Sequence, residues 1–302
     1  MKNKIILLIV FLFVPFYSFA EVTLELPYTG KNFFVGEKIK QKILLRSQAK
    51  KEINGFLRWS TTIKQAVIQR GESKIKLVPN EPLEMYIDLI SPVAKRKVSL
   101  VLKIEFFSGD NKQVEKKVLF SLFPLVDFDF IKRLAGEEKI GIFNKQGNSK
   151  EFFKELVLEE LPNDHSLAFF RGKIVLAYFP NTEEIFRDLH LLEQKASEGT
   201  IVIISLKGNR KIGTPQVLDE KHRILYGLTQ DDFDGWDGKV AAFLPVFQRD
   251  STVVLAYEGK PLCAEWFTGK GKIILCFFDL SENDPVTAIL FYNVLTYAYS
   301  SF

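Results

Sequence analysis

Polar and apolar residues alternate along the chain that follows residue 21. Val22, Leu24 and Leu26 alternate with polar neighbours, and the same period of two returns around Ile39 and Ile43. This period is typical of strands that bury one face and expose the other. Further runs of the same kind predict strands at 55–60, 65–69, 74–78, 83–89, 97–107 and 113–123.

Turn-forming residues separate these runs, among them Gly36, Gly71 and the segment 108–111. Seven or eight short antiparallel strands in about 100 residues are typical of an immunoglobulin-like sandwich. We therefore predict an all-β, immunoglobulin-like β-sandwich domain at residues 21–126. Trp59 is expected to pack in or beside its core, and a sugar-stacking platform is the alternative.

The pattern changes after Pro124, where apolar runs and helical spacing alternate. An alternation of strands and helices is typical of an α/β domain with a mainly parallel sheet. We predict a linker at 127–138 and this α/β domain at 139–302. The predicted elements are strands at 139–143, 166–169, 174–179, 200–205, 240–247, 252–257, 262–267 and 272–278, with helices at 149–161, 181–199 and 285–299.

The first twenty residues have the three regions of a secretory signal peptide. Lys2 and Lys4 precede the apolar run 5–13, and the small residues Ser18 and Ala20 come just before Glu21. The sequence therefore predicts a signal peptide at 1–20, cleaved after Ala20, and a periplasmic or secreted mature chain. The alternative, a membrane anchor, needs roughly 20 apolar residues. No later run reaches that length, so no transmembrane segment is expected in the mature chain.

Composition narrows the class of protein further. The chain has 302 residues, of which 47% are hydrophobic, with only 2 cysteines and 3 histidines. These values exclude bulk disorder and a disulfide-dense scaffold. Residues 21–126 carry 19 basic and 11 acidic side chains, whereas residues 127–302 carry 20 and 26. Because the N-terminal lysines alternate along strands and are not interleaved with aromatics, we expect a solvated strand face and no nucleic-acid partner.

Part of the second half resembles a known family. The resemblance rests on three segments, in this order: Gly199-Thr-Ile-Val-Ile-Ile-Ser205, Gly269-Lys-Gly-Lys-Ile-Ile-Leu275 and Leu290-Phe-Tyr-Asn-Val-Leu295. They resemble the class I glutamine-amidotransferase-like (flavodoxin-like) domain over about residues 138–301. The resemblance is to its non-catalytic versions at the ends of exported bacterial proteins, including some behind β-sandwiches in sugar-acting enzymes.

The resemblance also implies where catalytic groups would lie. Enzymes of that family use a cysteine on a strand-to-helix turn and a histidine late in the chain. Here the matching turn reads Ser205-Leu206-Lys207-Gly208, and the last histidine is His222. A Ser205–His222 pair is the alternative, but it lacks the Gly-x-Ser-x-Gly spacing. We therefore expect no glutaminase activity and no catalytic residue.

Two loops carry candidate ligand-binding residues. Asp232, Asp234 and Asp237 offer oxygen ligands for calcium, although their spacing is not that of an EF-hand, and a solvated turn is the alternative. Asn209, Arg210 and Lys211 follow a predicted parallel strand, where such sheets place ligands, so they form a candidate anion site, with a solvated loop as the alternative. No other metal site is predicted from the scattered histidines. No dinucleotide or phosphate-binding glycine motif occurs in the sequence, so no cofactor is predicted.

Cys263 and Cys276 lie on the two arms of the predicted hairpin between 262 and 278. If the turn centres on Gly269-Lys270, the two cysteines are directly opposed as a pair without backbone hydrogen bonds, close enough for a disulfide. The alternatives are two reduced buried thiols, or a bulge that turns the cysteines to opposite faces.

These observations favour an exported, non-enzymatic binding or assembly protein of the cell envelope. Its expected partner is an envelope protein or a glycan. The alternative is a hydrolase or carbohydrate-acting accessory enzyme that uses Asp231, Asp234 and Asp237.

Overall fold

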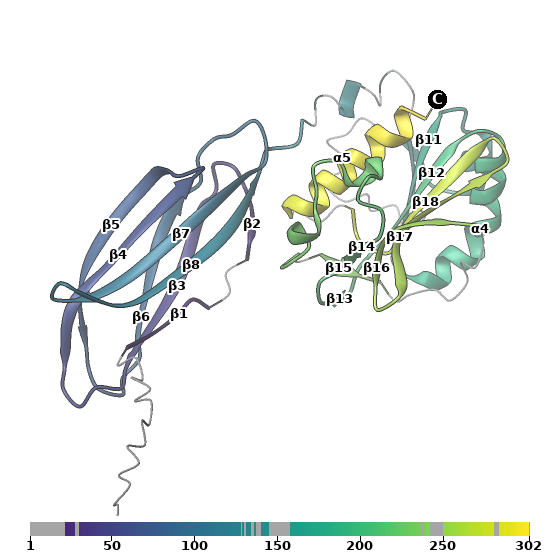
Figure 1. Cartoon of the computed structure of the whole chain (residues 1–302). Coiled ribbons are helices and arrows are strands. Elements are labelled where there is room, and N and C mark those ends of the chain that lie inside the picture. Colours follow the sequence, from purple (N-terminus) through teal and green to yellow (C-terminus); the bar gives the residue numbers. More distant parts are fainter. Residues whose placement is uncertain are drawn as a thin grey trace, which may run out of the picture.

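The protein is mostly β, with a few helices and several sheets, one of them mixed (Figure 1). The computed structural model describes residues 22–27, 30–127, 129, 131–133, 136, 140–144, 158–236, 238–241, 250–280 and 284–301. The predicted signal peptide and most of the helix predicted at 149–161 lie outside these residues.

The N-terminal β region, residues 22–123, consists of two sheets. Their strands are β1 Val22–Glu25, β2 Asn32–Phe34, β3 Lys38–Ser47, β4 Ile53–Ile63, β5 Ala66–Leu77, β6 Leu83–Ile90, β7 Val98–Ser108 and β8 Asn111–Phe123. One sheet has the order β1-β3-β6 and the other β2-β8-β7-β4-β5. Every pairing is antiparallel except β2 with β8.

The inner faces of these two sheets share one hydrophobic cluster. Leu57, Leu102, Phe106 and Phe120 lie in it with no exposed surface. The alternation read from the sequence therefore places one face of each strand in a common core. This arrangement is compatible with a β-sandwich.

Gly71 was predicted as a turn, and this prediction is wrong, because β5 runs through it without interruption. The turn between β4 and β5 lies at Lys64 and Gln65, whose φ values are 46° and 73°. Gly71 instead faces Trp59, where an added Cβ would lie 1.9 Å from Trp59 Cζ2. Glycine is therefore required here for the indole to lie against the strand, and Trp59 packs beside the core as predicted.

The C-terminal region, residues 140–301, is built around an eight-stranded sheet. Its order is β10-β9-β11-β12-β18-β17-β16-β14. The strands are β9 Ile140–Phe143, β10 Glu159–Leu161, β11 Ile174–Phe179, β12 Ile201–Leu206, β14 Gln216–Val217, β16 Thr252–Tyr257, β17 Lys260–Thr268 and β18 Gly271–Cys276. From β10 to β18 the neighbours are parallel, and from β18 to β14 they are antiparallel. The sheet is thus mixed, and the predicted mainly parallel order holds for one half.

Helices pack around this sheet. They are α3 Asp164–Phe169, α4 Thr182–Ser197 and α5 Pro285–Tyr299, with short 3-10 helices η1 Arg223–Leu225 and η2 Gln230–Asp232. Strands β13 Arg210–Lys211 and β15 Lys239–Val240 form a separate two-stranded sheet, and Val240 also forms an antiparallel bridge with Phe278, just after β18. None of the described helices is both long enough and apolar enough to cross a membrane.

Two predicted elements around residue 160 have the wrong type. Residues 166–169 belong to helix α3, because Asn163 and Ser166 form a reciprocal capping box that starts a helix. Residues 159–161, predicted as the end of a helix, form strand β10, which pairs with β9. Of the strand predicted at 240–247, Val240 belongs to β15, and residues 242–249 lie outside the described part of the chain.

Direct contacts join the N-terminal β region to the C-terminal region. Phe34 and Phe123 belong to the hydrophobic cluster of the C-terminal region. Lys97 forms an ion pair with Asp232, whose side chain has no exposed surface. Asn32 Nδ2 donates to the Asp232 carbonyl oxygen over 2.7 Å. Apolar burial and an ion pair to the buried Asp232 carboxylate therefore both connect the two regions.

Candidate functional site

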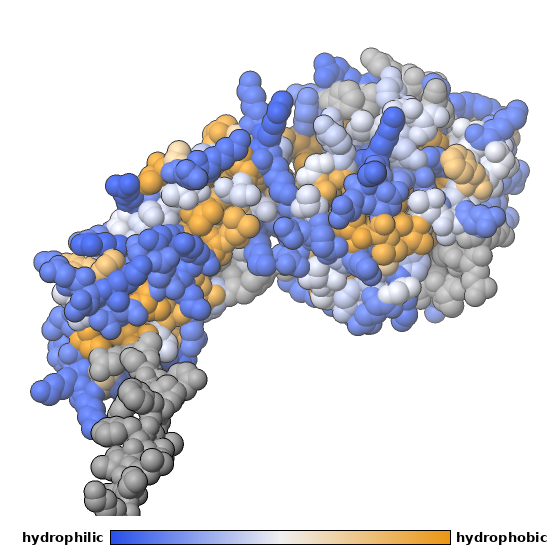
Figure 2. All heavy atoms as spheres, viewed as in Figure 1, coloured by the Kyte–Doolittle hydropathy of each residue, from blue (hydrophilic) through white to orange (hydrophobic). Residues whose placement is uncertain are grey.

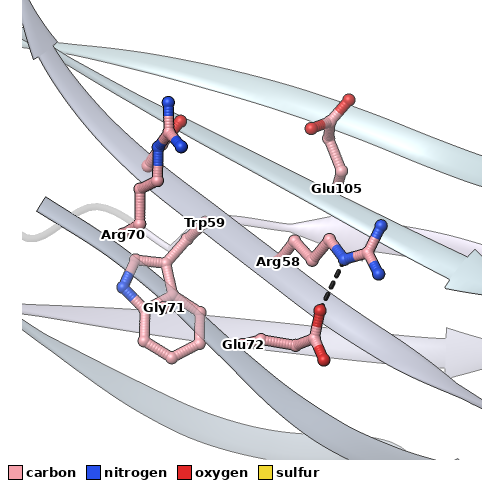
Figure 3. Close-up of a pocket in the computed structure, with 7 residues that line it drawn as sticks. Arg58, Trp59, Arg70, Gly71, Glu72 and Glu105 are labelled. Carbon is pink, nitrogen blue, oxygen red and sulfur yellow. Dashed lines mark hydrogen bonds and ion pairs between the residues drawn. The ribbon is translucent and has the colours of Figure 1, made fainter. Parts of the chain in front are cut away.

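A groove of about 540 Å³ lies on the outer face of the five-stranded sheet (Figure 3). Arg58 and Ser60 come from β4, Arg70 and Glu72 from β5, and Glu105 from β7, with Trp59 and Gly71 completing the lining. The hairpin register pairs Arg58 with Glu72 and Ser60 with Arg70, which places their side chains on one face. The groove therefore combines hydrogen-bond donors and acceptors.

Arg58 is held in place, whereas Arg70 is not. Arg58 Nε donates to Glu72 Oε2 over 2.6 Å, and the guanidinium lies 5.0 Å from the centre of the Phe107 ring. No described residue forms a hydrogen bond or ion pair with Arg70. A guanidinium presents its donors in a planar fork that matches a carboxylate. The groove thus offers one positioned and one unpaired arginine to an anionic group.

Trp59 does not supply a sugar-stacking platform in this groove. Its indole occupies the place of a side chain at Gly71, and it packs against the inner hydrophobic cluster. Figure 3 shows the indole beside Gly71 and the Arg70 side chain extending away from it. The chemistry of the groove is therefore that of its charged side chains and Ser60.

Ion pairs continue this polar face across β7 and β8. Glu115 binds Lys112 over 2.7 Å and Lys117 over 3.3 Å, and Lys103 binds Glu105 over 2.7 Å. The hydrogen bond from Lys112 is the largest cause that lowers the pKa of Glu115 to about 2. The Glu115 carboxylate therefore stays charged over the ordinary pH range and pairs with these neighbouring lysines.

A second polar cluster is buried at the start of β18. Glu265 Oε1 accepts from Tyr297 over 3.0 Å and lies 3.3 Å from His222 Nε2, and Lys272 Nζ lies 3.2 Å from Glu265 Oε2. Burial alone would raise the pKa of Glu265, but His222, Lys272 and Tyr297 together outweigh burial and lower it. Each charged group faces a partner within the cluster, which indicates a structural role.

The alternative catalytic pair, Ser205 with His222, is not formed. Ser205 Oγ donates to the Phe278 carbonyl oxygen and accepts from Leu280 N–H, both over 3.1 Å. His222 contacts Glu265 through Nε2 and accepts from Ile224 N–H through Nδ1. Both residues therefore bind parts of the fold and not one another.

The predicted calcium ligands have other contacts. Asp232 Oδ2 pairs with Lys97 and accepts from the N–H and the hydroxyl of Thr229. Asp234 lies 3.8 Å from Lys31 and accepts from Thr214. Asp237 lies outside the described residues. Within the part that the structure describes, no three acidic, histidine or cysteine side chains are grouped to hold a metal.

The other candidate residues occupy regular positions. Arg210 and Lys211 form β13, which pairs with β15, and Asn209 N–H donates to the Val240 carbonyl oxygen. Their side chains are exposed, so the anion site stays a prediction. Asp231, proposed for the hydrolase alternative, is also exposed.

The predicted opposition of Cys263 and Cys276 is confirmed by the register of β17 and β18. The turn residues are Gly269 and Lys270, as expected, and Gly269 has the positive φ of 61° that suits the first position of a two-residue turn. The sulfur atoms lie 3.8 Å apart as buried thiols. The disulfide itself stays a prediction.

Sequence reasoning did not single out Arg58, Arg70 and Glu72. These side chains come together because the chain turns at Lys64 and Gln65. That turn contains neither glycine nor asparagine, so its sequence gives no turn signal. If that turn had been located, the paired positions would have followed from counting outward along the two strands, as they do for the cysteines.

No family model matches the chain, and no curated protein matches it. Solved structures match parts of the chain at low TM-scores. The DNA glycosylase AlkC of Pseudomonas fluorescens is 14% identical over 34% of this chain and 31% of its own, with a TM-score of 0.28. The sporulation control protein Spo0M of Bacillus subtilis is 16% identical over 39% and 54%, with a TM-score of 0.25. The CARDB domain of the PF1109 protein of Pyrococcus furiosus is 12% identical over 36% and 90%, with a TM-score of 0.26.

Proposed function

We propose that this chain is an exported, non-enzymatic binding or assembly protein of the cell envelope. In this proposal an immunoglobulin-like β-sandwich at residues 21–126 is followed by a degenerate amidotransferase-like α/β domain at 139–302. The sandwich presents the binding surface, and the second domain serves as a rigid support. The partner is an envelope protein or a glycan.

The contacts of Ser205 carry the non-enzymatic part of this proposal. The sequence predicts Ser205 in the turn at which the resembled family has its nucleophilic cysteine, but Ser205 lies within strand β12, paired with Tyr178 and Cys276. Its hydroxyl is buried and bonded to the backbone at Phe278 and Leu280. A nucleophile needs a base within hydrogen-bond reach and access to its substrate. A buried hydroxyl that ties strand β12 to the backbone of residues 278–280 supports a structural role at this position.

The groove supports the binding part. Arg58, Arg70 and Glu72 lie on a sheet face that is accessible to a large partner. Both donors and acceptors are present, which suits a ligand with carboxylate and hydroxyl groups. A rigid β-scaffold also keeps such groups positioned before the ligand arrives, which lowers the entropic cost of binding.

An assay of ammonia release from glutamine tests the absence of the family's catalysis. We expect release equal to the buffer blank for the wild-type chain. Ammonia release that is abolished by Ser205→Ala would contradict the proposal. A Ser205→Ala chain with unchanged release but a lowered free energy of unfolding agrees with the structural role.

Mass spectrometry of the protein purified from its native envelope fraction tests export. We expect an N-terminus at Glu21, which signal cleavage after Ala20 produces. A mature chain that retains Met1 would contradict this part of the proposal.

A further inference from the structure

We propose that the outer face of the five-stranded sheet binds an anionic polysaccharide that carries carboxylate groups. The groove at Arg58 and Arg70 would receive one acidic sugar unit of this polymer. The inference rests on the proposed binding function and names its ligand class.

The first observation is the charge of this face. Strand register and burial place seven basic and three acidic side chains on the outer face of β5, β4, β7 and β8. They are Arg58, Arg70, Lys74, Lys76, Lys103, Lys112, Lys117, Glu72, Glu105 and Glu115. This face therefore carries a net charge of +4, half of the +8 excess that residues 21–126 carry as 19 basic and 11 acidic side chains.

The other sheet of the same region provides a comparison. The outer faces of β1, β3 and β6 carry Lys38, Lys40, Lys42 and Arg46 together with Glu25, Glu84 and Asp88. These charges nearly balance. Of the two outer faces, that of the five-stranded sheet therefore carries the larger positive excess, +4 against +1. A field of one sign attracts a ligand of the opposite sign and speeds its arrival.

The second observation is that some of these cations are free to bind. Arg70 and Lys74 form no ion pair or hydrogen bond with any residue that the structure describes. Arg58 uses Nε for Glu72, and its guanidinium carbon lies over the Phe107 ring, 5.0 Å from the ring centre. The planar guanidinium fork is pre-organised, so it loses less entropy per hydrogen bond when it binds a carboxylate.

The third observation distinguishes a sugar polymer from other anionic macromolecules. Glu72 and Glu105 lie in the same groove as the two arginines. These carboxylates accept hydrogen bonds from sugar hydroxyls, which the phosphodiester backbone of single-stranded DNA lacks. Single-stranded nucleic acid also needs aromatic faces for stacking, and Phe107 is covered by Arg58. Binding to a membrane or to a nucleic acid is therefore an alternative result that the test below can detect.

The experiment measures binding of fluorescently labelled polygalacturonate to the full chain by fluorescence anisotropy. Labelled dextran is the neutral probe. We expect binding to polygalacturonate and not to dextran, with weaker binding as ionic strength rises. Because two charged donors are lost, the double variant Arg70→Ala/Lys74→Ala should weaken binding at least about tenfold.

A matched double variant controls for net charge. Lys38→Ala/Arg46→Ala removes one lysine and one arginine from the outer face of the opposite sheet, where both side chains are exposed. We expect this variant to change the affinity less than about twofold, because screening weakens exposed charges on the far side. Arg58→Lys keeps the charge but loses the fork, so it should also weaken binding.

Several results would overturn the inference. These are the absence of polygalacturonate binding, equal binding of dextran, or equal losses in the two double variants. Tighter, Arg70-dependent binding of single-stranded DNA or of phosphatidylglycerol vesicles would replace the polysaccharide by that ligand. Shortening of the bound polymer, detected by size-exclusion chromatography, would contradict the non-enzymatic function while leaving the ligand class in place. Absence of binding leaves the glutaminase and export tests of the proposed function unaffected.

Discussion

At the scale of single residues, Glu265 illustrates how a buried charge is kept. Its side chain is 8% exposed, and Lys272, its ionic partner, is 6% exposed. His222 and Tyr297 contact the other carboxylate oxygen, Oε1. A buried charge is tolerated when such partners are present, and removal of one partner leaves the other uncompensated.

The variant Glu265→Gln should be less stable than the wild type at neutral pH. The lowered pKa of Glu265 means that its ionised form is favoured by folding. The ionised Glu265 carboxylate therefore contributes its full share to the free energy of unfolding above its ordinary pKa of about 4.5. This contribution is lost as the pH falls through the lower pKa of the folded state. Urea unfolding across pH should show a stability difference that shrinks below pH 4.5. Glu220→Gln, at an exposed site, is the control, and a pH-independent difference for Glu265→Gln would contradict this account.

A second residue-scale prediction concerns Gly71. The variant Gly71→Ala should lower the free energy of unfolding by about 1–3 kcal/mol, because its Cβ would overlap the Trp59 indole. Gly213→Ala is the control, since its nearest neighbour there, Tyr257 Oη, is 3.4 Å away. A smaller residue at position 59 should reduce the loss of stability that Gly71→Ala causes. A double-mutant cycle of Gly71→Ala with Trp59→Leu measures this reduction. Additive effects of the two substitutions would contradict direct contact.

At the scale of elements, the β17–β18 hairpin shows how local sequence fixes register. Its two-residue turn sets every pair, from Thr268 with Gly271 to Cys263 with Cys276. The two thiols are buried, and the hydrogen bond between them, together with burial, raises the pKa of Cys276. The thiolate is the form that reacts, so a thiol oxidant would act on this pair chiefly before the hairpin is buried.

We expect chain isolated from an oxidising envelope to contain the Cys263–Cys276 disulfide. Thiol counting on the denatured, unreduced protein should find no free thiol, and the bond should stabilise the fold by no more than about 3 kcal/mol because the loop is short. Reduced protein that is already folded should react slowly with oxidised glutathione. Two free thiols in the native material would contradict the bond, although not the pairing of the strands.

At the scale of the whole molecule, the two regions are joined by contacts of two kinds. Phe34 and Phe123 enter the C-terminal hydrophobic cluster, and Lys97 reaches the buried Asp232. Figure 2 shows hydrophilic side chains over most of the visible surface, with apolar areas between them. The carboxylate of Asp232 also accepts from Thr229, so one residue both caps the start of helix η2 and contacts the N-terminal β region.

The variant Lys97→Met should lower the free energy of unfolding by about 1–3 kcal/mol, because it leaves the Asp232 carboxylate buried without its cation. This is less than for a fully buried pair, since the Lys97 side chain is 27% exposed. Calorimetry should show two separated unfolding transitions where the wild type shows one, as the regions lose their coupling. Lys95→Met removes an exposed charge nearby and should change neither quantity. One unchanged transition for Lys97→Met would contradict a coupling role.

The sequence by itself determined the elements whose signals are local. Alternation with a period of two predicted most strands of the first half, and the helical spacing with its caps predicted α4 and α5. The opposition of the two cysteines also followed from sequence, because a glycine turn fixed the hairpin register. The wrong assignments at 159–161 and 166–169 arose where short segments have weak periodicity. There, a capping box and pairing with β9 decided the type of element.

Only the tertiary structure decided which side chains meet across elements. The turn at Lys64 and Gln65 brought Arg58, Arg70 and Glu72 together, and packing against Trp59 made Gly71 part of a strand. Asp232, which the sequence predicted as a calcium ligand, pairs with Lys97 because the two regions pack against each other. The physical reason is that periodicity reports which face of an element is buried. The partners on that face are set by register and by contacts between residues far apart in the chain.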